Sequence, residues 1–288
     1  MSRRRLGRRG VTLVELLVAL VVAAVVGAGL VKLLLGQARA TSQQEAWRTA
    51  RTAPRIGMNR LMSELRMVDP LGGVEAAAAG GQDFTLRVPY AIGAMCWSDG
   101  ATSIVSLMPV DSAMYAEGGY SGFGWRTSTG TYSYVASGTG PTSAGAASCA
   151  AASITTVPAI GSSPAGQVVT LTGAVAPVPD IGTLFLMYRR IRYEFKASTM
   201  FPGRIGLWRT VLATGATEEV AAPFDAAARV RFYVLDATVP QAPVPASLAD
   251  IRGLELQLRG SSDGAPEGSS TAKVAAVTAS VFFKNRPE

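Results

Sequence analysis

The chain has 288 residues, of which 27 are lysine or arginine and 20 are aspartate or glutamate, giving a formal charge of +7. It contains no histidine, which excludes serine–histidine–aspartate and cysteine–histidine catalysis, histidine-ligated zinc sites and histidine pH switches. Hydrophobic residues make up 48% of the chain and charged residues only 16%, an apolar excess that indicates a membrane segment.

The positive charge is concentrated at the N-terminus. Five arginines lie in the first ten residues, so the formal charge of the remaining chain falls to +2. Directly after this basic leader, residues 11–31 form an apolar run with a single charged side chain, Glu15. At about 1.5 Å per residue, a helix of this length can cross a hydrocarbon layer roughly 30 Å thick. The positive-inside rule then predicts a cytoplasmic leader at residues 1–10, a transmembrane helix at residues 11–35 and an outward-facing remainder.

Glu15 is the unusual residue of this apolar run. A carboxylate inside a span costs roughly 2.5–3.5 kcal/mol near the helix centre and less near an end. It is therefore expected either to pair with a positive charge or to lie at the level of the lipid headgroups.

The stretch from Arg8 to Leu20 combines basic residues, a glycine, the sequence Thr-Leu-Val-Glu-Leu and an apolar helix. This stretch resembles the processing motif of type IV pilins and type II secretion pseudopilins. The resemblance implies cleavage by an inner-membrane prepilin peptidase between Gly10 and Val11, followed by N-methylation of Val11. It also implies that the Glu15 carboxylate offsets the N-terminal amine of a neighbouring subunit. Val11 stands where most major pilins have phenylalanine.

A secretory signal peptide cut after Ala38-Arg39-Ala40 is the alternative interpretation of the same segment. The apolar region of a signal peptide is usually about 7–15 residues long. The longer run found here, together with Glu15 inside it, favours the pilin-type interpretation.

Residues 36–69 are predicted to continue the helix beyond the membrane. Pro54 cannot donate a backbone hydrogen bond and clashes with the preceding turn, so a kink or break is expected there. After Pro54, apolar residues recur at spacings of three and four, which predicts a helix face packed on a sheet. This face consists of Met58, Leu61, Met62, Leu65 and Val68. The polar residues between them, Glu64 included, are assigned to the opposite face.

Alternating apolar and polar residues predict a β-rich domain over residues 70–288. The predicted strands lie at 83–90, 184–196, 205–211, 229–236, 251–259 and 274–284. One long helix followed by short antiparallel strands predicts an α+β fold, in which the helix covers one face of the sheet.

Four segments of the C-terminal half carry a second resemblance. They are Arg192-Tyr193-Glu194-Phe195, Leu207-Trp208-Arg209, residues 230–236 and residues 281–286. Their order is similar to that in J-type pseudopilins and W-type minor pilins. This similarity implies a pilin-like fold for the periplasmic or extracellular domain.

Residues 93–166 are rich in glycine, serine, threonine and alanine, a composition that builds little core by itself. The segment also contains aromatic residues: Tyr115, Tyr120, Phe123, Trp125, Tyr132 and Tyr134. The favoured interpretation is an insertion whose aromatic residues anchor it to the sheet. The alternative is a ligand or partner surface at an exposed tip.

The only cysteines of the chain, Cys96 and Cys149, bracket most of this segment. In an exported domain they meet an oxidising compartment and can form a disulfide, with two separate buried thiols as the alternative. No dinucleotide-binding, P-loop or EF-hand pattern is present, so no cofactor and no metal site are predicted.

Together these features predict a non-enzymatic minor pilin or pseudopilin of the bacterial inner membrane. It would assemble with other pilins or pseudopilins into a type IV pilus or type II secretion pseudopilus, or prime its tip. One alternative is a tip module that binds a surface ligand, or DNA during competence, which requires a basic surface. Candidate arginines for DNA are Arg189, Arg190, Arg192, Arg204, Arg209, Arg229 and Arg231. The other is a periplasmic enzyme that uses carboxylates, but no such constellation is visible and no catalytic residue is predicted.

Mass spectrometry of the mature amino terminus tests the processing interpretation. We expect a methylated Val11 as the first residue of the protein recovered from its native membrane. An unmodified Thr41 would indicate a signal peptide instead, and an intact Met1 would contradict processing after Gly10.

Overall fold

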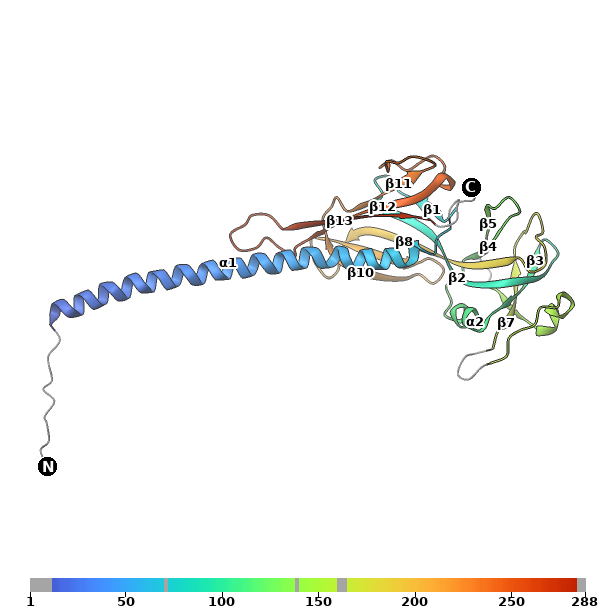
Figure 1. Cartoon of the computed structure of the whole chain (residues 1–288), viewed down its shortest axis with the longest axis horizontal. Coiled ribbons are helices and arrows are strands. Elements are labelled where there is room, and N and C mark those ends of the chain that lie inside the picture. The colour runs from blue at the N-terminus through green and yellow to red at the C-terminus, as the bar shows by residue number, and fades with distance from the viewer. Residues whose placement is uncertain (1–11, 70–71, 138–139, 160–164, 284–288) are drawn as a thin grey trace, which may run out of the picture.

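A computed structural model describes residues 12–69, 72–137, 140–159 and 165–283 of the chain. The molecule consists of a long helix, α1 (Leu13–Leu65), and a β-rich domain (Figure 1). The second half of α1 lies along the domain, whereas its first half extends away from it. This arrangement confirms the predicted α+β fold, with a long N-terminal helix packed on an antiparallel sheet.

Within the described residues, thirteen strands form one sheet, and every strand pair is antiparallel. The strands are β1 (Val74–Ala77), β2 (Asp83–Ser98), β3 (Thr102–Leu107), β4 (Gly122–Arg126), β5 (Tyr132–Ala136), β6 (Thr142–Ala144), β7 (Gln167–Thr172), β8 (Leu184–Ala197), β9 (Ile205–Val211), β10 (Ala216–Phe224), β11 (Arg229–Val234), β12 (Ile251–Ser261) and β13 (Val274–Phe282). The helical elements beside α1 are α2 (Pro109–Ala116) and the 3-10 turns η1 (Ala146–Ala152) and η2 (Leu248–Asp250).

The long strands β2 and β8 run through the whole domain and pair with each other from Asp83 opposite Glu194 to Ala94 opposite Leu184. Beyond β8 the sheet continues through β9, β10, β12 and β11, with β13 on β12. Beyond β2 it continues through β3, β7 and β6, while β4 and β5 extend from the first residues of β8. We call the part with β1 and β9–β13 the proximal half and the part with β3–β7 the distal half.

The main core lies between α1 and the proximal half. The predicted helix face is confirmed, since Leu61, Leu65 and Val68 are fully buried, Met58 is buried and Met62 is partly buried. The buried face also extends further back along α1 through small residues that the apolar pattern did not reveal. These are Ala46, Ala50, Ala53 and Gly57. Because small side chains occupy little space, they let the helix approach the sheet closely.

The distal half encloses a second core. Phe123 and Trp125 of β4 are fully buried and stack on Phe185 of β8, with ring centroids 5.6 and 5.5 Å from the Phe185 centroid. Valines and leucines of β3 and β7 complete this core. Both β4 aromatics therefore anchor the glycine- and serine-rich segment to the sheet, as the favoured interpretation predicted, and this segment supplies strands of its own.

The helix α1 continues through Pro54, so a break is absent there. The proline ring and the carbonyl of Ala50, which Pro54 leaves without its usual intrahelical donor, lie against Gly260 of β12. A Cβ atom at residue 260 would overlap both the Ala50 carbonyl oxygen and the Pro54 ring. Glycine at this position therefore lets the sheet support the helix where the proline weakens it.

The variant Gly260→Ala tests this close approach. The added methyl group must push α1 away from β12, and we expect the free energy of unfolding to fall by about 1–3 kcal/mol. Urea unfolding of the full chain in mild detergent, followed by tryptophan fluorescence, measures the loss. Gly264→Ala is the matched control, since a Cβ there meets nothing within 4 Å, and equal losses in both variants would contradict the argument.

Candidate assembly site

The first turn of α1 is closed by a capping box between Thr12 and Glu15. The backbone N–H of Glu15 donates to the Thr12 hydroxyl oxygen at 3.3 Å, and the backbone N–H of Thr12 donates to Oε2 of Glu15 at 3.1 Å. Such a box satisfies N–H groups that have no partner within the helix. The Glu15 carboxylate is thus held at the helix N-terminus, where the helix dipole favours a negative charge. Gly10 and Val11, the predicted cleavage and methylation residues, lie outside the described residues.

The first half of α1 presents an apolar surface without cover. It contains a window long and apolar enough to cross a membrane, and none of that window is buried in the structure. Large side chains are exposed all around it, such as Leu13, Val25 and Leu34. A continuous apolar surface of this size requires lipid or other apolar helices around it.

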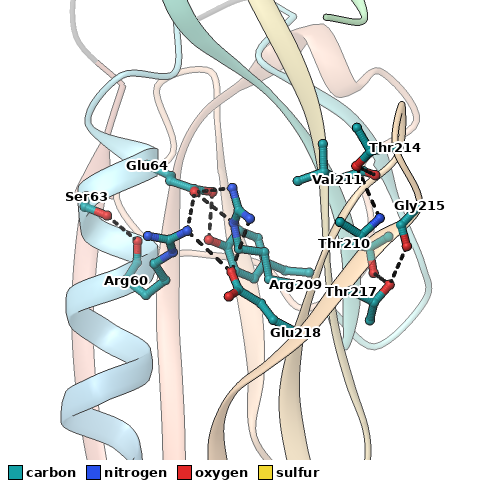
Figure 2. Close-up of polar contacts among 12 residues, drawn as sticks. Arg60, Ser63, Glu64, Arg209, Thr210, Val211, Thr214, Gly215, Thr217 and Glu218 are labelled. Carbon is teal, nitrogen blue, oxygen red and sulfur yellow. Dashed lines mark hydrogen bonds and ion pairs between the residues drawn. The ribbon is translucent and has the colours of Figure 1, made fainter. Parts of the chain in front are cut away.

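A buried ion pair joins the second half of α1 to the sheet (Figure 2). Glu64 of α1 accepts hydrogen bonds from Nε of Arg209 at 2.9 Å and from the hydroxyl of Tyr193 at 2.7 Å. The side chains of Glu64 and Arg209 are only 8% and 11% exposed. Arg60 and Glu218 extend the network to the surface, since Glu218 lies 3.4 Å from Arg60 and 3.2 Å from Arg209. Three elements, α1, β8 and β9, therefore meet at one carboxylate.

The electrostatics of this network fix the protonation of Tyr193. Burial is the largest cause that raises the pKa of Tyr193 above its usual value, and the nearby Glu64 carboxylate is the second. The phenol therefore stays neutral and donates a hydrogen bond to Glu64.

Burial also affects Asp69, which follows the end of α1. Burial raises its pKa to about 6, and the nearby hydroxyl of Tyr134 in β5 partly counters this shift. The end of α1 thus lies near the distal half of the sheet.

At two of these residues the structure differs from the prediction made from sequence. Glu64 was assigned to the polar face of the helix, but it is buried, because Arg209 and Tyr193 supply the partners that a buried carboxylate needs. Arg209 was grouped with the candidate arginines for DNA, but it faces Glu64. The alternation in β9 placed Arg209 in a strand, and no local pattern links it to a helix residue so far away in the chain.

Cys96 of β2 and Cys149 of η1 are joined by a disulfide across a sequence separation of 53 residues. Both sulfurs lie in a small buried cluster with Val168 of β7. In the chain-entropy model, closing a loop of this size stabilises the fold by about 4 kcal/mol. The bond ties the irregular part of the distal half to the end of the long central strand.

The candidate arginines for DNA have partners within the protein. Five of them form ion pairs with carboxylates: Arg189, Arg190, Arg192, Arg209 and Arg231. The remaining two, Arg204 and Arg229, donate to the Asp263 carbonyl and the Gln257 side chain. The β-sheet therefore offers its arginines mainly as internal cross-links between strands.

Comparison with known proteins bears on the N-terminal region. Residues 5–31 match the family model described as the prokaryotic N-terminal methylation motif. No curated protein and no solved structure matches the chain. The chain thus carries the signature of type IV pilins and pseudopilins, on an α+β fold whose long apolar helix is consistent with a pilin-like protein.

The variant Arg209→Met tests the network at Glu64. It leaves a buried carboxylate without its main cation, and we expect a loss of about 3–5 kcal/mol in the free energy of unfolding. The double variant Glu64→Gln/Arg209→Met removes both charges and keeps an acceptor for Tyr193, so it should lose less than Arg209→Met alone. Urea unfolding of the full chain measures both losses, and a larger loss in the double variant would argue against the network.

Proposed function

We propose that the protein is a minor pilin or pseudopilin, a non-enzymatic subunit of a type IV pilus or type II secretion pseudopilus or of its tip. The observation that carries this proposal is the position of the methylation motif. It covers the start of a helix whose first half is fully exposed and apolar and whose second half is fastened to a folded domain. A prepilin peptidase would cleave between Gly10 and Val11 and methylate Val11.

The charge distribution supports a single-pass orientation in the bacterial inner membrane. The arginines of the leader favour a cytoplasmic N-terminus. The disulfide between Cys96 and Cys149 suits an oxidising compartment such as the periplasm. The β-rich domain would therefore be periplasmic before assembly and exposed on the fibre afterwards.

Assembly would transfer the first half of α1 from lipid to the helices of neighbouring subunits. Glu15 lies at the N-terminal end of this surface, where its carboxylate can pair with the N-terminal amine of a neighbour. The Glu64–Arg209 pair and the close contact at Gly260 fasten α1 to the sheet. A fibre built from these helices would therefore carry each domain in a fixed orientation.

A DNA-binding tip is not proposed, because the arginines that suggested it are engaged in contacts within the domain. A mature formal charge of only +2 also offers little attraction for a phosphate backbone.

The variant Glu15→Ala tests the assembly role. It removes a charge from an apolar helix, so membrane insertion and cleavage of the leader should persist. Incorporation into sheared or purified fibres should fall strongly, because the N-terminal amine of a neighbour would lose its counter-charge. Immunoblots of membrane and fibre fractions measure both quantities. Glu45→Ala, an exposed carboxylate outside the apolar span, is the matched control, and wild-type recovery of Glu15→Ala in fibres would overturn the role of Glu15.

A further inference from the structure

Four arginines form a line on the side of α1 opposite the sheet, three within the helix and one at its C-cap. They are Arg48, Arg51, Arg55 and Arg66, which we call the basic stripe, and all four are exposed. Successive members are three, four and eleven residues apart, spacings close to whole numbers of helical turns. The stripe therefore follows one side of the helix for about 27 Å.

The four arginines of the basic stripe lack counter-charges. Within the part of the chain that the structure describes, none of its members forms an ion pair with a carboxylate. By contrast, seven of the sheet arginines are paired with carboxylates: Arg87, Arg189, Arg190, Arg192, Arg209, Arg231 and Arg259. The sheet arginines Arg126, Arg229 and Arg252 instead donate to carbonyl or amide oxygens. Like charges one turn apart disfavour a helix, so external carboxylates would relieve a repulsion that the fold leaves in place.

Apolar side chains accompany the basic stripe. Trp47 is 38% exposed and Ile56 is 48% exposed, and the guanidinium carbon of Arg51 lies 5.4 Å from the centroid of the Trp47 ring. Arginine and tryptophan are enriched in protein–protein interfaces and in their hot spots. This combination favours a protein surface as the partner over a nucleic-acid backbone, which is recognised mainly through charge.

We propose that the basic stripe docks on an acidic face of a different subunit of the same fibre or tip complex. The proposal rests on the proposed function, because the stripe continues the helix directly beyond the apolar surface that would pack against neighbouring subunits. The stripe would therefore add contacts between opposite charges to the apolar contacts of that interface.

A second copy of this chain is a poor complement for the basic stripe. Its α1 would present the same four positive charges, with Glu15 and Glu45 as the exposed carboxylates among the described residues of that helix. Many sheet carboxylates are already paired with arginines, among them Glu75, Asp83, Glu194, Glu218 and Glu255. Charge complementarity therefore favours a non-identical partner, and like charges would oppose pairing of two copies.

The first experiment replaces the chromosomal protein by the full-length triple variant Arg48→Glu/Arg51→Glu/Arg55→Glu. The matched control is Arg48→Lys/Arg51→Lys/Arg55→Lys, which keeps the charge. We expect both variants to be processed and to accumulate in the membrane at the wild-type level. The glutamate variant should fall by about tenfold or more in the fibre fraction, since repulsion replaces attraction, while the lysine variant retains most of the wild-type amount. Equal thermal unfolding midpoints would show that the domain is intact.

The second experiment places a photo-crosslinking amino acid at Asn59, which is exposed and in line with the stripe. The expected product is a cross-link to a peptide of another fibre subunit that contains a cluster of aspartate or glutamate, and the glutamate variant should abolish it. Cross-links only to a second copy, to lipid or to DNA would overturn the proposal, as would wild-type fibre levels of the glutamate variant. Absence of the wild-type protein from fibres would instead refute the proposed function itself.

Discussion

The structure depends on one continuous helix that must satisfy two different surroundings. Among the described residues, none covers the first half of α1, which needs an apolar environment, whereas its second half is packed on the proximal half of the sheet. Small residues allow close contact in the middle of the helix, and larger residues fill the core toward its end. Pro54 lies at a close contact with the sheet, and Gly260 of β12 provides the space that the proline and the freed carbonyl of Ala50 require.

Most of the fold could be predicted from sequence, because helices and strands follow from patterns among neighbouring residues. The apolar stripe of α1 and the strands β8, β9 and β12 are each read within a single element, and the structure confirms them. The sequence did not predict that β2 runs on to Ser98 or that a second core forms around Phe185. Both features arise from the pairing of distant strands, which fixes the surroundings of a residue but leaves no trace in local periodicity.

The same distinction applies to the functional residues. The N-terminal motif is contiguous, so Gly10, Val11 and Glu15 could be proposed from sequence, and the family match covers the same stretch. The role of Glu64 could not be proposed, because its partner Arg209 lies 145 residues away. Arginines could be counted from sequence but their pairing could not, so a formal charge near +2 concealed a difference among them. Most sheet arginines bind carboxylates, whereas the basic stripe forms no ion pair within the described residues.

The buried pair of Glu64 and Arg209 mainly determines how α1 is rotated about its own axis. Replacing a buried ion pair by apolar residues is often neutral for stability, whereas leaving one partner alone is strongly unfavourable. A rotation of α1 by one residue, about 100°, would turn Glu64 away from Arg209 and leave a guanidinium buried without its counter-charge. The apolar contacts of Leu61 and Leu65 are less selective, because hydrophobic packing is not directional. The ion pair therefore selects one rotation of the helix, and this rotation sets which side of α1 faces away from the domain.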